Sequence, residues 1–406
     1  MNIQLPIGVA DILPQDYALK NWLCSQIGTV CRRSGYRGVS PPLFERADVF
    51  MCGSVAEDKI YKFIDKNGEA VALRPDVTPQ IARIAAGMNE FETYPLRLYY
   101  TEHVYRCSEH LQESRNELLQ AGAELYGVSS ANADAEILSL AVASLLAAGL
   151  LDFRINISDV RFIASVLEGS GLSDAEQRRV RNLIIKKDYI SVADVVQGAN
   201  IPECIARILC DPAQCIGDIS LLDECEAVVG ATAKTIIKNL RDVYEILALT
   251  ELNKYVFFDL SLTGRFDYYT GIVMRGYATD VLCPVVEGGR YDNICSRFGE
   301  DISAVGFAIN VNELATALKN DDVEFTYPFA DTLVAWSPAM KKQALTVAEQ
   351  LRGGGLYAEN SIIDNDFDNN IAYAKKRGLS GILYFSEDGT ILHDIKTGAT
   401  YNLQEP

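Results

Sequence analysis

The chain has 406 residues, of which 49% are hydrophobic and 23% are charged, so it is long enough for two or three globular domains with buried cores. No apolar run reaches the roughly 18–20 residues of a membrane-spanning helix, and the first residues lack a secretory signal pattern, so we expect a soluble cytoplasmic protein with no membrane partner. The net charge of −18 disfavours contact with phosphate backbones, and we expect no nucleic-acid partner.

The ten cysteines are scattered without a Cys-x-x-Cys pair, and the chain has only three histidines. The closest cysteines lie between Cys204 and Cys225, but their spacing matches no zinc-ligand pattern and no histidine is near them in the sequence. We therefore expect reduced thiols in a cytosolic protein, no metal site and no cofactor.

The first part of the chain alternates irregularly between helical and extended patterns, which indicates an α+β protein with a mixed or antiparallel sheet. Helices are predicted where apolar residues recur every three or four positions, and strands where Tyr, Val and Leu cluster. Thr78 and Pro79 suit the start of a helix. The predicted elements are a helix over 16–34, a strand over 71–74, a helix over 78–87, and strands over 96–106 and 118–127 joined by a hairpin loop.

Residues 158 to about 250 are mostly helical in pattern and resemble an inserted module. Strands are predicted over 255–260, 268–277, 281–286 and 304–311, the last leading into a helix through Lys319, and Gly288-Gly289 predicts a turn. A charged linker then separates a core domain, 1–325, from a small α/β domain, 326–406.

Five segments, in order, carry a family pattern. They are PIGVADILP near the N-terminus, SGYRGVSPPLFE at 34–45, LRPDVTPQIARIAA at 73–86, the stretch from Tyr105 to Gly127, and the stretch from Phe266 to Asn310. Together they resemble histidyl-tRNA synthetase and its non-catalytic paralogues. The resemblance implies a class II aminoacyl-tRNA synthetase-like fold, with a six- or seven-stranded antiparallel sheet flanked by helices. It also implies a homodimer and a shortened anticodon-binding-like domain at the C-terminus.

The residues that would handle ATP are mostly missing. Arginines stabilise charge on a transferring phosphoryl group because the guanidinium is permanently charged and bidentate. Arg106 matches the arginine of family motif 2, but the glutamate that follows in the family is Ser108 here, and the motif 3 arginine is Glu313. The catalytic arginine of the synthetase falls at Gly264, and Arg265 would face the opposite side of an extended chain. The resemblance therefore implies no catalytic residue.

The residues that match the family's amino-acid-binding site are mostly retained. Carboxylates could bind an ammonium group, Arg106 a carboxylate, and tyrosines a ring. By match to the family, the expected histidine-binding residues are Asp76, Thr78, Arg106, Gln120, Glu124, Tyr268 and Tyr269, with Tyr291 nearby.

Each of these residues could also have a purely structural role. Thr78 could serve only as a helix cap, and Gln120 and Glu124, four apart on one face of a strand, could be solvent-exposed. Tyr268 and Tyr269 are adjacent and would face opposite ways on a strand, which places one of them in the core. Residues 327–406 hold seven Lys and Arg against ten Asp and Glu, which is unlike an RNA-reading domain.

The resemblance as a whole implies a regulatory subunit, required for the activity of a short-form catalytic subunit of ATP phosphoribosyltransferase, the first enzyme of histidine biosynthesis. In this interpretation the chain is a homodimer within a hetero-oligomer, and L-histidine is the inhibitory effector. Two alternatives remain from the residues alone: an active histidyl-tRNA synthetase and a free-standing histidine-binding module.

Overall fold

The computed structural model describes residues 4–51, 55–88, 93–107, 115–168, 170–197, 199–211, 215–262, 268–321, 325, 329–363 and 366–403. The chain forms two compact units, Met1–Glu324 and Phe325–Pro406. Each unit has its own sheet and its own buried apolar residues, and they are described separately below.

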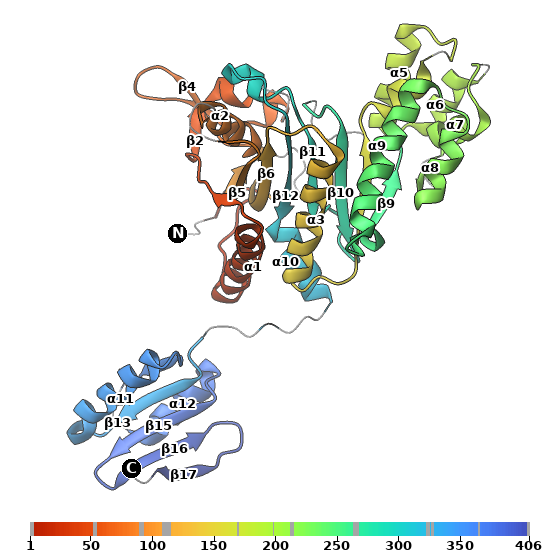
Figure 1. The fold of residues 1–406 in the computed structure, drawn as a ribbon. Coiled ribbons are helices and arrows are strands. Elements are labelled where there is room, and N and C mark those ends of the chain that lie inside the picture. The colour runs from red at the N-terminus through yellow and green to blue at the C-terminus, as the bar shows by residue number, and fades with distance from the viewer. Residues whose placement is uncertain are drawn as a thin grey trace. The chain divides into compact units, whose positions relative to one another are not determined.

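The first unit is built on a sheet with nine strands among the described residues, in the order β1-β5-β6-β12-β11-β10-β7-β9-β8 (Figure 1). Neighbouring strands from β5 through β7 are all antiparallel, whereas β1 pairs with β5 and β7 pairs with β9 in parallel. In sheet order the strands are Arg37–Gly38, Leu96–Tyr105, Glu117–Tyr126, Ala304–Asn310, Val286–Arg290, Ile272–Ala278, Phe153–Asp159, Val256–Asp259 and Ile216–Gly217. The antiparallel sheet flanked by helices confirms the expected class II synthetase-like fold.

One face of the sheet is covered by long helices that pack side by side: α1, α3, α9 and α10. Their bounds are Pro14–Arg33, Ala131–Ala147, Ala231–Ala248 and Val311–Asn320. Helix α10 begins where β12 ends, because the side chain of Asn310 accepts hydrogen bonds from the backbone N–H groups of Asn312 and Glu313 at 3.1 and 3.3 Å.

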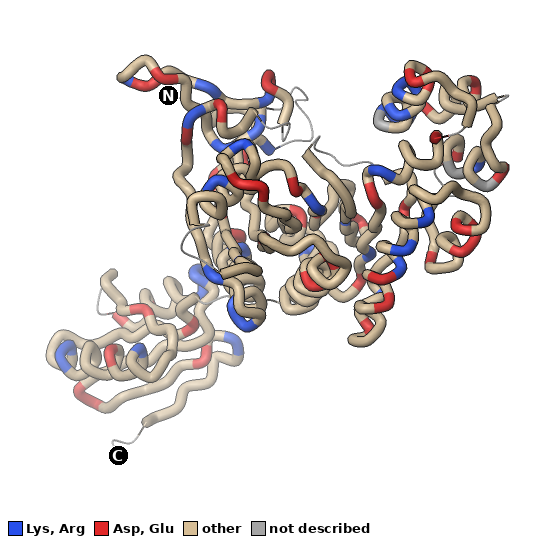
Figure 2. The backbone as a smooth tube through the Cα atoms, turned by 45° about the horizontal axis from the view of Figure 1, so that its top comes forward, with Lys and Arg blue, Asp and Glu red and all other residues tan. Residues whose placement is uncertain are grey.

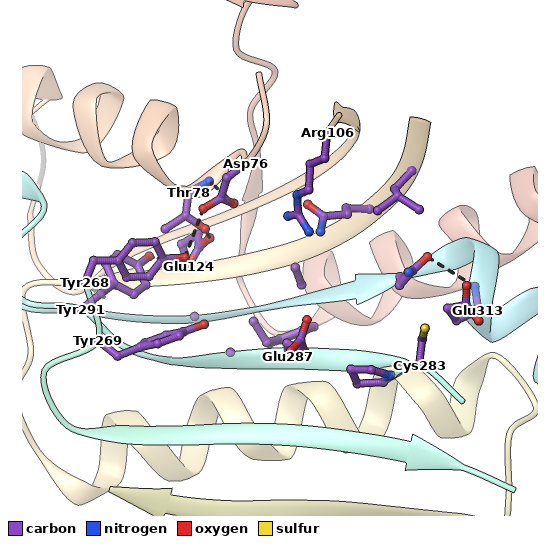
Figure 3. Close-up of a pocket in the computed structure, with 18 of the residues that line it drawn as sticks. Asp76, Thr78, Arg106, Glu124, Tyr268, Tyr269, Cys283, Glu287, Tyr291 and Glu313 are labelled. Carbon is purple, nitrogen blue, oxygen red and sulfur yellow. Dashed lines mark hydrogen bonds between the residues drawn. The ribbon is translucent and has the colours of Figure 1, made fainter. Parts of the chain in front are cut away.

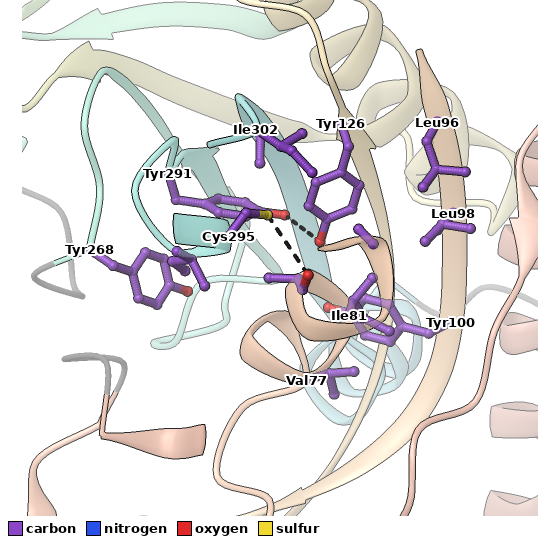
Figure 4. Packing of buried hydrophobic residues seen from close by; sticks show 14 of the residues in the cluster. Val77, Ile81, Leu96, Leu98, Tyr100, Tyr126, Tyr268, Tyr291, Cys295 and Ile302 are labelled. Atoms are coloured by element: carbon purple, nitrogen blue, oxygen red, sulfur yellow. Dashed lines mark hydrogen bonds between the residues drawn. The ribbon is translucent and has the colours of Figure 1, made fainter. Parts of the chain in front are cut away.

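The opposite face is covered by helix α2, Thr78–Met88, and this is where the main core cluster lies (Figure 4). Val77 and Ile81 pack against Leu98 and Tyr100 of β5, and against Tyr126 of β6. These side chains are at most 1% exposed. Their burial anchors the start of α2 directly above the central strands.

Two smaller parts complete the first unit. A three-stranded sheet in the order β2-β4-β3 comprises Phe44–Arg46, Ala70–Leu73 and Lys62–Ile64. Between β7 and β9 the chain forms a group of helices, α4 to α8, that stands beyond one end of the main sheet in Figure 1. Their bounds are Phe162–Leu167, Asp174–Ile185, Tyr189–Val196, Glu203–Cys210 and Ile219–Glu226.

The sequence predicted several of these elements, but it gave a wrong position for strand β11 and no prediction for β7, which lies inside the main sheet. The predicted strand over 281–286 and turn at Gly288-Gly289 are wrong, because β11 runs from Val286 to Arg290 and includes both glycines. Strand β11 passes very close to its neighbour: a Cβ at Gly288 would lie 2.3 Å from the Gly306 carbonyl oxygen. The glycines therefore allow close strand approach within the sheet. Strand β10 also begins later than predicted, at Ile272.

The second unit is a five-stranded sheet in the order β14-β13-β15-β16-β17, with helices α11 and α12. Two core clusters, one containing Val334 and Trp336 and the other Leu333 and Ala335, show that alternate residues of β13 are buried on both faces. The strands, in sheet order, are Ala358–Asn360, Thr332–Trp336, Gly381–Ser386, Gly389–Asp394 and Thr400–Leu403, and the helices are Lys341–Gly353 and Phe367–Arg377.

Charged residues of both signs are interspersed along the backbone (Figure 2). The basic run Lys375–Arg377 forms the last turn of α12, where Arg377 pairs with Glu359 at 3.2 Å. Cations suit this end of a helix dipole. Of the helices in the described ranges, none is both long and apolar enough to cross a membrane.

Candidate functional site

A cavity of about 170 Å³ opens on the α2 side of the main sheet, above β6, β12 and β11 (Figure 3). All seven residues expected from the family match line it, as does Tyr291. They come from four separate parts of the chain: the turn before α2, strands β5 and β6 with their ends, the turn before β10, and the turn after β11. A cavity of about 150 Å³ is known to accept a benzene-sized ring, so this one suits a small-molecule ligand.

Three side chains form a hydrogen-bonded network at the inner end of the cavity. The hydroxyl of Thr78 donates to Oε1 of Glu124 at 3.0 Å, and the hydroxyl of Tyr291 donates to Oε2 of the same carboxyl group. Asp76 accepts a hydrogen bond from the Thr78 backbone N–H at 3.3 Å, so the helix is capped by Asp76 and the Thr78 hydroxyl is committed to Glu124. The reading of Thr78 as the N-cap of α2 is therefore wrong.

Glu124 is held at this place by the pairing of β6 with β12. It lies opposite Gly306 in the register, and Gln120 lies opposite Asn310 on the same face. Glu124 is 1% exposed, so its reading as a solvent-exposed strand residue is wrong. Gly122, between Gln120 and Glu124, makes room for Tyr100, because a Cβ atom at this position would lie 2.5 Å from the Tyr100 hydroxyl oxygen.

Burial controls the protonation of the two inner carboxyl groups. Loss of hydration raises the pKa of Glu124 to about 8, and the nearby charge of Asp76 adds to this, although the Tyr291 and Thr78 hydroxyls oppose it. Burial also raises the pKa of Asp76, against the attraction of Arg106. A cationic or hydrogen-bond-donating group in the cavity would favour the ionised form of both carboxyl groups.

Tyr268 belongs to the main core cluster, as expected for one of the pair, and both Tyr268 and Tyr269 also line the cavity. They lie in the turn before β10 and not on the strand, so the alternation of a strand does not separate their rings. The ring centroids are 4.9 Å apart, and the hydroxyl of Tyr268 donates to Oδ2 of Asp76 at 3.1 Å. The two rings form an aromatic wall beside the carboxyl groups.

Arg106 and Gln120 supply the polar groups nearer the mouth. Nε of Arg106 donates to the carbonyl oxygen of Pro75 at 2.7 Å, which fixes the guanidinium close to Asp76. The Oε1 atom of Gln120 is buried and accepts no hydrogen bond within the described part of the chain. A buried acceptor without a partner is costly, and a ligand N–H group would satisfy it.

Other lining residues were not among those expected for the amino-acid site. Glu313 stands at the outer end on α10, Arg115 at the start of the segment leading into β6, and Glu287 on β11. Arg275 donates to Glu287 at 3.1 Å from the neighbouring strand. The sequence prediction did not include Glu287, because the two glycines that follow it predict a turn. Side chains alternate along a strand, and a strand through these glycines would place Glu287 at the cavity.

The charges of the cavity favour an amino acid over a nucleoside triphosphate. Four carboxyl groups line it, from Asp76, Glu124, Glu287 and Glu313, against the guanidinium groups of Arg106 and Arg115. Glu313 occupies the position of the motif 3 arginine, so a triphosphate would meet repulsion there.

Three residues were compared above with the family's ATP-handling residues. Gly264, Arg265 and Ser108 lie outside the described residues. Within the described ranges, no group of three or more His, Cys, Asp and Glu side chains is arranged to hold a metal ion.

Comparison with known proteins shows the family to which the chain belongs. A family model described as histidyl-tRNA synthetase matches residues 8–314. The ATP phosphoribosyltransferase regulatory subunit of Acetivibrio thermocellus is 34% identical over 400 residues, covering 98% of this chain and 96% of that protein. The protein of the same name from Ruminiclostridium cellulolyticum is 32% identical over 402 residues, covering 98% of this chain and 96% of that protein.

Solved structures show the same architecture. A crystal structure described as an ATP phosphoribosyltransferase regulatory subunit/histidyl-tRNA synthetase, from Bacillus halodurans, superposes with a TM-score of 0.83 at 27% identity, covering 95% of this chain and 99% of that one. Histidyl-tRNA synthetase from Nostoc shares the fold, with a TM-score of 0.81 at 21% identity, covering 99% of this chain and 97% of that one. The chain therefore belongs to the family of ATP phosphoribosyltransferase regulatory subunits, which is built on the histidyl-tRNA synthetase fold.

Proposed function

We propose that this chain activates a short-form catalytic subunit of ATP phosphoribosyltransferase and makes it sensitive to L-histidine, which binds in the cavity above β6. The observation that carries the proposal is the meeting of all seven expected residues in one cavity whose outer end carries Glu313 where a synthetase needs a cation. The chain itself carries out no reaction; it contributes a binding site and a surface for its partner.

Each part of histidine has a chemically suited group in the cavity. The ammonium group fits beside Asp76 and the carboxyl network of Glu124, since buried carboxylates favour a cation. The carboxylate fits Arg106, which can bind it through two parallel hydrogen bonds. The imidazole ring fits against Tyr268 and Tyr269, and its N–H group can satisfy a buried acceptor such as Gln120.

Inhibition requires that histidine bind one quaternary state more tightly than another. We propose a homodimer of this chain within a hetero-oligomer with the catalytic subunit, located in the cytoplasm, where the ten cysteines would remain reduced. Contact between the subunits would then transmit the difference in histidine affinity to the catalytic site.

The regulatory role is tested by measuring phosphoribosyl-ATP formation by a short-form catalytic subunit from the same organism, with and without this chain, and with histidine added. We expect activity that depends on this chain and falls as histidine is added. A rate unaffected by this chain, with a catalytic subunit that is otherwise competent, would refute the activating role. A rate that depends on this chain but ignores histidine would refute only the effector role.

The histidine site is tested by calorimetric titration of L-histidine into the full chain, alone and with its catalytic partner. Glu124→Gln keeps the shape of the side chain but removes its charge, and we expect it to weaken binding at least tenfold. Glu245→Gln, on the exposed side of α9, is the matched control and should bind as the unaltered chain does. Equal affinity in the two variants would place the histidine site elsewhere.

A further inference from the structure

A second cavity, of about 350 Å³, lies on the opposite face of the main sheet, between the sheet, α1, α10 and the N-terminal segment. Residues 117 and 119 of β6 line it, whereas residues 120 and 124 of the same strand line the first cavity. This follows from the alternation of side chains along a strand. The two cavities are therefore separated by the thickness of the sheet.

Lys20 is the most unusual residue of this second cavity. It lies on α1 with only 7% of its surface exposed, and its Nζ atom forms no hydrogen bond or ion pair within the described part of the chain. Lysine is rarely buried unless it is paired, because removing an ammonium group from water without a partner is costly. The loss of hydration lowers the pKa of Lys20, and the charge of Arg115 lowers it further. An ammonium group that lines a cavity and has no partner in the described part of the chain suits a binding site for an anion.

Further basic side chains surround the same space. Arg115, His103 of β5 and Lys319 of α10 line the cavity with Lys20. Arg115, like Lys20, has no hydrogen-bond or ion-pair partner among the residues that the structure describes. Lysine acts as a point charge and arginine as a planar fork, and together they suit a tetrahedral phosphoryl group.

Two of the acidic residues that line the cavity, Asp16 and Glu117, already accept hydrogen bonds from protein groups. Asp16 accepts a hydrogen bond from Nζ of Lys319, and Glu117 accepts one from the hydroxyl of Tyr105 at 3.2 Å. Lys319, Lys20 and Arg115 all contribute to lowering the pKa of Asp16, and the Lys319 hydrogen bond is the largest cause. Three carboxyl groups, of Asp11, Asp16 and Glu117, thus line the cavity with the three cations Lys20, Arg115 and Lys319, and of these cations only Lys319 is bound by a carboxyl group within the described residues.

The N-terminal segment closes one side of the cavity, which gives the motif PIGVADILP a structural role. Gly8 to Ile12 line the cavity, and Asn116 holds this segment in place. The Asn116 backbone N–H donates to the Gly8 carbonyl at 2.7 Å, and its side-chain N–H donates to the Ile7 carbonyl at 3.0 Å. The wall and the cations thus belong to one ordered site.

We propose that the cavity around Lys20 binds a phosphoryl group, either as free phosphate or as the phosphate of a small ester. Nζ of Lys20 and the guanidinium of Arg115 bind the oxygens, and the N-terminal segment encloses the ligand. Arg115 lines both this cavity and the cavity proposed for histidine, and the other lining residues of the two cavities differ.

The test is a calorimetric titration of the full chain with inorganic phosphate, with glycerol phosphate and with acetate at equal ionic strength. We expect saturable phosphate binding that Lys20→Met weakens at least tenfold and that Lys234→Met, an exposed lysine on α9, leaves unchanged. Glycerol phosphate binding through Lys20 would identify an ester as the ligand, and its failure would identify free phosphate. No saturable phosphate binding, equal binding by Lys20→Met, or acetate binding as tight as phosphate would overturn the proposal.

A second measurement guards against a purely structural role of Lys20. In phosphate-free buffer, Lys20→Met should unfold at a urea concentration equal to or above that of the unaltered chain, because the variant removes a desolvated charge without a partner. A clearly lower midpoint would mean that Lys20 serves the fold, for instance through the nearby Asp16, and would overturn the assignment of an anion site.

Discussion

Glu124 of β6 and Gly306 of β12 face each other in the sheet register, and a Cβ atom at position 306 would lie only 1.5 Å from Oε2 of Glu124. The carboxyl group thus occupies the space that any other residue at position 306 would need. Because Thr78 and Tyr291 donate to the same carboxyl group, the absence of a side chain on β12 is what lets three distant parts of the chain meet at one point.

Gly306→Ala should therefore displace the Glu124 carboxyl group and disrupt the cavity that we propose for histidine. We expect a loss of stability of about 1–3 kcal/mol, typical of overpacking in a core, together with loss of histidine binding. Urea denaturation and histidine titration measure the two effects. Gly87→Ala is the matched control, because no atom lies within 4 Å of a Cβ built at Gly87. Full histidine affinity in Gly306→Ala would show that the ligand does not depend on the position of Glu124.

Stability should also depend on pH through Glu124. Its pKa rises from 4.5 to about 8 on folding, so between these values the folded state holds a proton that the unfolded state has lost. The free energy of unfolding therefore falls as pH rises from about 4.5 to 8, by up to about 1.4 kcal/mol per pH unit from this group. Burial raises the pKa of Asp76 as well and acts in the same direction.

Glu124→Gln removes this titration. Denaturation at pH 5, 7 and 9 should show that the stability of the variant, relative to the unaltered chain, increases as pH rises. Glu245→Gln, an exposed residue of α9, should show the same dependence as the unaltered chain. A constant difference between Glu124→Gln and the unaltered chain across this range would mean that Glu124 is already ionised when buried.

Local patterns predicted the central strands well because those strands carry long runs of apolar and aromatic residues. Strands β5 and β6 were predicted to within one residue at each end, and the helix that became α2 begins at the predicted Thr78. The error at β11 has a physical cause. Glycines favour turns in an isolated chain, but at 288 and 289 they permit a backbone approach that depends on β12, more than ten residues away in the sequence.

The sequence predicted several residues that line the cavity but not the hydrogen bonds between them. All seven residues expected from the family match line the cavity, because each stands in a recognisable segment, whereas Arg115, Glu287 and Glu313 also line it without having been expected. That Asp76 caps α2 while Thr78 binds Glu124 depends on distances between segments, and local sequence does not contain them. The unpaired Lys20 was also beyond sequence reasoning, since its position on α1 fits an ordinary helical pattern.

The identity of residue 313 should decide whether the outer end of the cavity accepts phosphate groups. Glu313→Arg places a cation beside Arg106 and Arg115, and we expect the affinity for ATP to rise several-fold while histidine-dependent pyrophosphate exchange stays absent. ATP titration and an exchange assay measure these outcomes. Glu245→Arg, the same change of charge on the exposed side of α9, controls for net charge. An equal rise in both variants would show that the position of Glu313 has no special effect.

Arg115 lines both cavities and should couple their ligands. Under the two proposals, Arg115 binds the phosphoryl group directly, and its charge also attracts the histidine carboxylate that Arg106 binds on the other face. We expect saturating phosphate to weaken histidine binding about fivefold, near the lower end of common coupling, because Arg115 is exposed and its charge is screened by salt. Histidine should weaken phosphate binding by the same factor, since coupling between two binding sites is reciprocal.

Calorimetric titrations of each ligand, with and without the other, measure the coupling at constant ionic strength. Arg115→Met should lower both affinities and abolish the coupling, whereas Arg178→Met, an exposed arginine on α5, should preserve it. If histidine and phosphate bound independently in the unaltered chain, Arg115 would serve at most one of the two cavities. If coupling survived in Arg115→Met, it would have to pass through the sheet, by way of β6, whose alternate side chains line the two cavities.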